Sequence, residues 1–250
     1  MIIGLVAVIV AFFAIFAGPK DDPLIADIDQ FAKKVVIDKD IYAQIKGESK
    51  HIARLGKAYG KQTKKFAKQF ADITVDQAST RQDFESLLTT MMTYEDEVNS
   101  DYYSRRLNIL SLVSDDEWAG ILEKAEKKIT KDKKSKQKLL EMYSKGLANS
   151  QMKIVAAIDE SDRKQKAEEY LDEFVLHTGQ VTEDIFLVYH DNADLLRSRG
   201  ATMEQMMDMS DTFASDWGEL YDAYIDLHQN LAELCKASEW KKVGKELAKI

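Results

Sequence analysis

The chain of 250 residues is poor in the residue types that cross-link, break or bend a fold. Its one cysteine, Cys235, excludes a domain held together by disulfide bonds. Its two prolines are Pro19 and Pro23, so no proline interrupts a helix in the rest of the chain. Together with 11 glycines, 45% hydrophobic residues and 31% charged residues, this scarcity indicates long helices around an apolar core.

Positive net charge and the short motifs of common catalysts are also missing. The net charge of −8 argues against a general nucleic-acid binder, so we expect no nucleic-acid partner. The sequence has no glycine-rich phosphate loop, no Gly-x-Ser-x-Gly nucleophile motif and no paired-cysteine metal site. We therefore predict a protein that is not an enzyme and that carries no cofactor.

The longest run without a charged residue is at the N-terminus. Residues 1–17 are apolar, and a segment with glycine, proline and charged residues follows over residues 18–23. As a helix, the run spans about 25 Å, slightly less than the hydrocarbon core of a bilayer. The sequence therefore predicts a transmembrane anchor over residues 1–18 and a single-pass membrane protein. A cleaved signal peptide is the alternative, but the run lacks a basic start, and Ile15 stands where the cleavage site needs a small residue.

Small residues share one face of this predicted anchor. They recur at intervals of three and four positions and comprise Gly4, Ala7, Ala11, Ala14 and Gly18. In lipid, such a face lets two helix backbones approach closely, so we expect it to pack on a membrane helix of a partner or of a second copy. The alternative is that glycine and alanine are simply common in membrane helices. Lysine and arginine occur only after the anchor, which favours the cytoplasmic side for the rest of the chain over the periplasmic or extracellular side.

After Pro23, the apolar residues repeat about every 3.5 positions over long stretches, which is typical of packed helices. Residues 203–234 keep the most regular alternation, and capping boxes at Ser114 and Thr202 predict two helix starts. The turns between the stretches are short, so neighbouring helices should be antiparallel. We predict an all-α fold in which a single transmembrane helix precedes an elongated antiparallel, up-and-down bundle of about five long helices.

The pattern divides the chain into four predicted segments. They are the anchor over residues 1–18, a juxtamembrane segment with a short helix over 19–39, the helical bundle domain over 40–235, and a short basic amphipathic helix over 236–250. In the last segment Trp240, Val243 and Leu247 share one face, with lysines elsewhere. A helix of this kind can lie on an anionic membrane surface, which makes anionic lipid a candidate ligand. The alternative is a helix that caps the end of the bundle.

Charged residues of opposite sign are sorted onto different predicted helices. Residues 202–235 include no lysine or arginine, whereas lysines dominate residues 46–68 and 124–138. The predicted acidic interaction face comprises Asp208, Asp211, Glu219, Asp222 and Asp226. The predicted basic interaction face comprises Lys57, Lys61, Lys64, Lys68, Lys127, Lys131 and Lys134. Such a surface attracts a complementary partner or stacks copies of the chain, and the alternative is that the charges serve solubility alone.

The histidines offer little for a metal centre. Glu48 and His51 have the spacing that supplies two ligands to a di-iron centre in a helical bundle, but the chain has no second motif of this kind. His177 lies near an apolar stripe, which favours a hydrogen-bonded position at the edge of the core. His228 follows Leu227 on the acidic segment, where a pH-sensitive contact is an option. We predict no metal site.

Three functions are compatible with these features. The first is a structural, scaffold or accessory subunit that docks on a membrane protein complex or self-assembles. The second is a membrane-bound sensor or ligand-binding module, whose cleft would be lined by the aromatic residues Tyr94, Tyr102, Tyr103, Tyr143, Trp217 and Tyr224. The third is a membrane-active protein that forms pores or senses curvature. The absence of a catalytic motif and the sorted charges favour the first.

Overall fold

The computed structural model describes residues 23–250, apart from some side chains, most of them between residues 132 and 144 and between residues 186 and 196. All regular structure in this part of the chain is helical. The long helices are α4 (Lys39–Val75), α5 (Arg81–Leu112), α6 (Asp115–Ala156), α7 (Ser161–Asp191) and α9 (Met203–Leu234). The short helices are α2 (Pro23–Ala26), α3 (Ile28–Ala32), α8 (Ala193–Arg197) and α10 (Ala237–Leu247). The predicted all-α helical bundle is confirmed.

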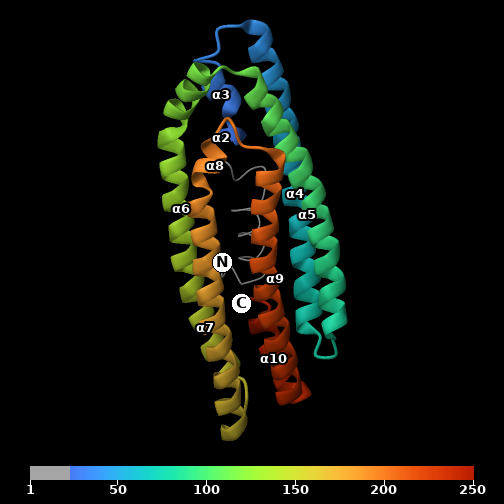
Figure 1. Ribbon diagram of the computed structural model, residues 1–250. Helices are drawn as coiled ribbons and strands as arrows, with labels where there is room; N and C mark the ends of the chain where they lie inside the picture. The colour runs from blue at the N-terminus through green and yellow to red at the C-terminus, as the bar shows by residue number, and fades with distance from the viewer. Residues whose placement is uncertain (1–22) are drawn as a thin grey trace.

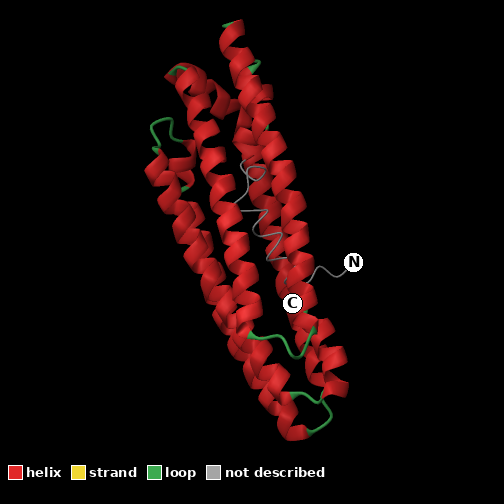
Figure 2. Ribbon diagram, turned by 90° about the vertical axis from the view of Figure 1, so that its right-hand side faces the viewer, coloured by secondary structure: helices red, strands yellow, loops and turns green. Residues whose placement is uncertain are grey.

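Consecutive long helices run in opposite directions in an elongated bundle (Figure 1). α4 packs along α5, α5 against α9, α9 along α7, and α7 along α6. The short helices α2 and α3 contact both α4 and α6 at one end of the bundle, and α10 contacts the same two helices toward the other end. The view from the side shows that loops join the helices only near the ends (Figure 2).

Local sequence signals set where the long helices begin. Ser114 accepts a hydrogen bond from the Glu117 backbone N–H at 3.2 Å, and the Glu117 carboxylate accepts one from the Ser114 backbone N–H at 2.9 Å. Thr202 and Gln205 form the same reciprocal pair at the start of α9. These bonds satisfy donors that have no partner inside the helix, which explains the sharp boundaries. Both predicted capping boxes are confirmed.

The end of the bundle that includes α10 has an aromatic core, which we call the aromatic cluster. It comprises Phe70, Phe84, Phe174, Tyr224, His228 and Trp240. The ring centres of Phe70 and Tyr224 lie 5.1 Å apart, and His228 lies 4.9 Å from Phe84 and 5.2 Å from Trp240. These rings come from α4, α5, α7, α9 and α10, so the cluster joins five helices at one point. Aromatic pairs in such tilted and edge-on arrangements add stability beyond the area that they bury.

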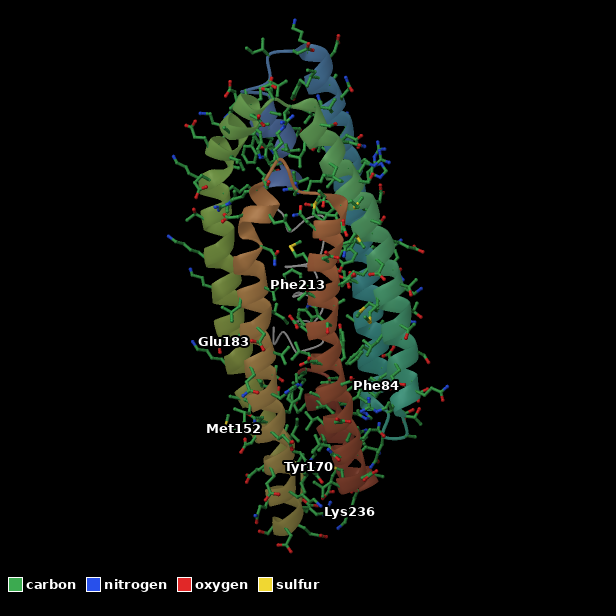
Figure 3. All side chains as sticks on the ribbon, viewed as in Figure 1. Phe84, Met152, Tyr170, Glu183, Phe213 and Lys236 are labelled. Carbon is green, nitrogen blue, oxygen red and sulfur yellow. The ribbon has the colours of Figure 1, made fainter. Side chains whose placement is uncertain are left out.

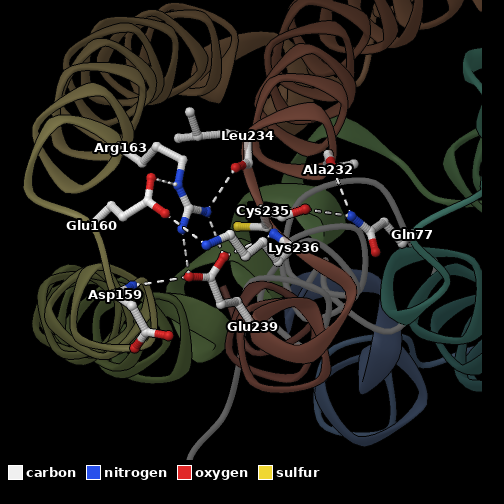
Figure 4. A network of polar contacts seen from close by, with 9 residues as sticks. All are labelled: Gln77, Asp159, Glu160, Arg163, Ala232, Leu234, Cys235, Lys236 and Glu239. Atoms are coloured by element: carbon white, nitrogen blue, oxygen red, sulfur yellow. Dashed lines mark hydrogen bonds and ion pairs between the residues drawn. The ribbon is translucent and has the colours of Figure 1, made fainter.

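A polar network next to this cluster fastens the C-terminal helix; we call it the clasp. It consists of Glu160, Arg163, Lys236 and Glu239 (Figure 4). Arg163 Nη2 donates to Glu239 Oε1 at 2.9 Å and Arg163 Nη1 donates to Glu239 Oε2 at 2.5 Å. The same carboxylate accepts hydrogen bonds from the backbone N–H groups of Asp159 and Lys236 at 3.0 and 2.8 Å. The clasp therefore ties α10 to the turn between α6 and α7.

The C-terminal helix corrects one prediction. Trp240, Val243 and Leu247 are buried, and α10 packs against α4 and α6, so these residues present no apolar face to a membrane surface. The Trp240 indole N–H donates to the Val75 carbonyl at 2.9 Å, which fixes the helix on the end of α4. The alternative of a capping helix describes what is found. The apolar stripe that suggested membrane binding is satisfied by the bundle itself.

The predicted membrane localisation is also corrected. Within residues 23–250, no helix combines the length and the apolar character that crossing a bilayer requires, because every long helix carries many charged residues. This finding contradicts a single-pass membrane protein. The predicted anchor over residues 1–18 lies outside the described residues. Its small-residue face lies there too, namely Gly4, Ala7, Ala11, Ala14 and Gly18.

Candidate functional site

A groove of about 880 Å³ runs between α7 and α9. Four carboxylates line it, Glu173 from α7 and Glu219, Asp222 and Asp226 from α9, and no lysine or arginine does. The other lining residues are polar, aromatic or aliphatic: Tyr170, Phe174, Leu176, His177, Gln180, Ala223, Leu227 and Asn230. Figure 3 marks Tyr170 on the part of α7 that borders the groove. We call this surface the acidic groove.

The regular pattern of α9 explains why the acids gather here. The apolar residues of the 3.5-residue repeat, such as Phe213, Trp217 and Leu220, are buried toward the core. The acids occupy positions on the other side of the helix and are therefore exposed. All five residues of the predicted acidic face are exposed, and three of them line the groove. The remaining two, Asp208 and Asp211, lie nearer the start of the same helix.

The α7 wall of the groove was not predicted. Tyr170, Glu173, His177 and Gln180 recur at intervals of three, four and three residues, so they form one stripe along α7. This polar stripe was visible in the sequence, but nothing local says that α7 lies beside α9. His177 is half-buried, as expected for the edge of the core, and it also lines the groove. Leu176 adds an aliphatic side chain that is 67% exposed.

The negative charge of α9 is only partly balanced within the described part of the chain. Arg81 of α5 donates to Asp222 at 3.0 Å and also pairs with Asp226. Partial burial and the charge of Asp211 raise the pKa of Asp96 on α5. Partial burial and the charges of Glu219 and Asp184 raise the pKa of Asp216. The Oδ2 atom of Asp216 is buried without a hydrogen-bond partner. Burial is the larger cause of both shifts, and the neighbouring carboxylates of α9 add to it.

The predicted basic residues lie on other helices. Lys57, Lys61, Lys64 and Lys68 are exposed on α4, and Lys127, Lys131 and Lys134 are exposed on α6. The structure does not bring either set to the acidic groove, whose walls are α7 and α9. The two predicted faces therefore belong to different sides of the bundle.

Glu48 and His51 join α4 to α5 through ion pairs and hydrogen bonds. His51 Nε2 lies 2.8 Å from Asp101 Oδ2, and the same aspartate accepts from Arg105 Nε at 3.0 Å. Glu48 accepts hydrogen bonds from Arg105 at 3.2 Å and from Asn108 at 3.3 Å. Glu48 and His51, the two potential metal ligands, are thus each bound by other side chains of the protein. Residues 23–250 contain no group of three or more histidine, cysteine, aspartate or glutamate side chains that could hold a metal ion.

A buried polar layer crosses the middle of the α4–α5–α9 interface and was missed from the sequence. Tyr59 donates to Glu95 at 3.2 Å, and Asn99 donates to Ser210 at 2.8 Å while its own Oδ1 has no hydrogen-bond partner. Burial raises the pKa of Glu95 to about 8. A signal existed, because Glu95 falls in the apolar stripe between Met91 and Val98. The acidic residues that follow it, Asp96 and Glu97, are exposed.

The aromatic residues predicted to line a ligand cleft are core residues for the most part. Tyr102, Tyr103, Trp217 and Tyr224 are buried, and Tyr94 is half-buried with its ring stacked 6.2 Å from that of Tyr59. The side chain of Tyr143 lies outside the described residues. The cavity beside Trp217 has about 20 Å³, which is room for about one water molecule.

Comparisons with family models, curated proteins and solved structures found no match for this chain.

Proposed function

We propose that the protein is a non-enzymatic scaffold or accessory subunit that binds a partner with a positively charged helical surface. The observation that carries this proposal is the acidic groove, with four carboxylates and no lining lysine or arginine. The groove runs along two helices that lie side by side, so it suits an extended helical partner better than a compact ligand. Charge complementarity of this kind sets the rate and specificity of association more than the final affinity.

The second candidate, a small-ligand module, has weaker support. A drug-sized ligand needs a largely enclosed and apolar pocket. The acidic groove is open to solvent and polar, and the cavity beside Trp217 is too small. We therefore favour a macromolecular partner.

Affinity capture with matched variants tests the proposed function. The full-length, tagged chain is compared with a groove variant, Glu219→Gln, Asp222→Asn and Asp226→Asn together. The control is Glu97→Gln, Glu126→Gln and Glu168→Gln together, which removes three exposed acids that do not line the groove. We expect to find a protein that the wild type and the control both retain. The groove variant should retain about tenfold less of it, and about 0.3 M salt should also release it from the wild type.

Two checks make this experiment decisive. Circular dichroism should show that the groove variant keeps its helical content and cooperative melting, since the three side chains are exposed and their substitutes have the same shape. If the groove variant and the wild type retain the same proteins in the same amounts, the proposed function is wrong.

A further inference from the structure

An uninterrupted row of positive charge runs along α4. It comprises Lys50, Arg54, Lys57, Lys61, Lys64 and Lys68. The steps alternate between four and three residues, so the six side chains form one straight stripe on the helix, about 27 Å long. All six are exposed, and none forms an ion pair with an acid in the described part of the chain. We call this row the α4 stripe.

The opposite side of α4 explains why the stripe faces solvent. Ile52, Tyr59 and Phe66 are buried at seven-residue intervals and pack toward α5 and the core. A helix that buries one side along its whole length must present the other side along its whole length. The stripe is therefore held in place by the same repeat that builds the bundle.

The acids of α9 follow nearly the same spacing. They are Glu204, Asp208, Asp211, Glu219, Asp222 and Asp226, with the exposed Ser215 at the position between the two halves. This row is about 33 Å long and opens at its lower half into the acidic groove. Two rows of opposite charge thus share their step and have similar lengths.

The two rows cannot meet within one molecule. α5 packs against both α4 and α9, and each row is exposed on its own helix, with no ion pair between the two rows in the described part of the chain. Within residues 23–250, the cation that reaches the groove acids is Arg81, which belongs to α5 and not to the α4 stripe. Each row is left for another molecule.

We propose that the α4 stripe of one copy docks along the acidic groove of a second copy. This inference rests on the proposed function and names the partner. The contact joins two different surfaces, so each added copy leaves one stripe and one groove open, and the product is a chain of copies that grows with concentration. Individual exposed ion pairs contribute little, so the contact depends on the whole array and weakens steeply with salt.

Sedimentation of the full-length protein, with two neutralised variants, tests this arrangement. The groove variant is Glu219→Gln, Asp222→Asn and Asp226→Asn; the stripe variant is Lys57→Gln, Lys61→Gln, Lys64→Gln and Lys68→Gln. At about 25 mM salt we expect the wild-type mass to rise with concentration and each variant alone to be monomeric. An equal mixture of the variants should form a species of two chains and stop there. That species joins the intact stripe of the groove variant to the intact groove of the stripe variant.

Three results would overturn the inference. The first is a wild-type protein that stays monomeric at low salt up to about 100 μM. The second is association that strengthens or persists at about 0.5 M salt, which would indicate apolar contact instead. The third is binding to vesicles of anionic lipid that the stripe variant loses, from a protein that is monomeric without vesicles. A monomeric protein that still captures a foreign partner through the groove would refute only this inference and leave the proposed function intact.

Discussion

Two buried glutamates show how differently one residue type can be treated in this bundle. Glu239 in the clasp is 3% exposed, and Glu95 in the middle of the molecule is 8% exposed. The hydrogen-bonded Arg163 guanidinium, aided by the backbone N–H groups of Asp159 and Lys236, lowers the pKa of Glu239 to about 2. Burial raises the pKa of Glu95 to about 8, and the hydrogen bond from Tyr59, which lowers it, offsets only part of that effect. Partners, and not burial alone, decide whether such a group is charged.

The two regions differ in how completely their buried polar groups are hydrogen-bonded. At the clasp every carboxylate oxygen of Glu239 has two donors, so the network holds α10 on the bundle. At α9 two buried acceptors lack a hydrogen-bond partner: Oδ1 of Asn99, whose amide N–H group donates to Ser210 of this helix, and Oδ2 of Asp216. Unsatisfied groups cost stability and persist where another requirement outweighs that cost. In our proposal that requirement is the negative surface of α9.

Breaking the clasp should have the largest effect. Arg163→Ala leaves Glu239 buried without its cation, and we expect the free energy of unfolding to fall by about 3 to 5 kcal/mol. Urea unfolding followed by circular dichroism at pH 7 measures it. Lys236→Ala is the matched control, because its exposed Nζ pairs with the exposed Glu160, and it should cost less than about 1 kcal/mol. Equal costs for the two variants would refute the distinction, within the clasp, between the buried Arg163–Glu239 pair and the exposed Lys236–Glu160 pair.

Neutralising Glu95 should stabilise the protein, whereas breaking the clasp should destabilise it. The pKa is about 8 in the fold against an ordinary value of 4.5, so the folded state binds more protons between these limits, and stability falls as pH rises through them. Glu95→Gln resembles the protonated carboxyl at every pH. We expect it to match the wild type near pH 4 and to be more stable by about 3 kcal/mol at pH 9. Glu97→Gln, at an exposed neighbouring site, should show no such pH-dependent gain.

The two glutamates also show what the sequence could predict. The 3.5-residue repeat and the capping boxes sufficed for the helices, because both are local properties. Glu95 was predictable in principle from its place in the apolar stripe. The pairing of Arg163 with Glu239 was not, because 76 residues separate them and only packing brings them together. The same limit explains why the α7 wall of the groove was missed, and why the sequence left open whether Trp240 faces a membrane or the bundle.

A titration of stability below neutrality should single out His228. Burial lowers its pKa below the ordinary 6.5, and its Nε2 and Nδ1 atoms lie 3.1 Å from the Thr74 carbonyl and 3.2 Å from Gln229 Nε2. The unfolded chain therefore binds the proton first, and stability is lost as pH falls from 6.5 through the folded pKa, by at most about 1.4 kcal/mol per pH unit. His228→Phe should remove this loss between pH 6.5 and 5. Glu239 titrates lower, between 4.5 and 2, so the two windows are separable. Over the same interval the wild type gains stability from Glu95 as pH falls, so the comparison is made in a Glu95→Gln background. A stability of that variant that does not change between pH 6.5 and 5 would contradict this assignment.

Asp216 offers the smallest and sharpest test of the uncompensated charge on α9. Partial burial and the neighbouring charges of Glu219 and Asp184 raise its pKa above the ordinary 3.8, so the ionised form is the one that the fold disfavours. Stability is therefore lost as pH rises from 3.8 through the folded pKa, and Asp216→Asn should recover it. Because much of this side chain is screened by solvent, we expect a gain of only about 0.5 kcal/mol at pH 7 and none near pH 3. Asp208→Asn, at an exposed position of the acidic face on the same helix, should give no gain. Raising the salt concentration should shrink the Asp216→Asn gain, because salt screens the repulsion that the variant removes. A gain that is equal for both variants would mean that α9 carries a uniform surface charge without a strained position, and the contrast with the clasp would then rest on Glu95 alone.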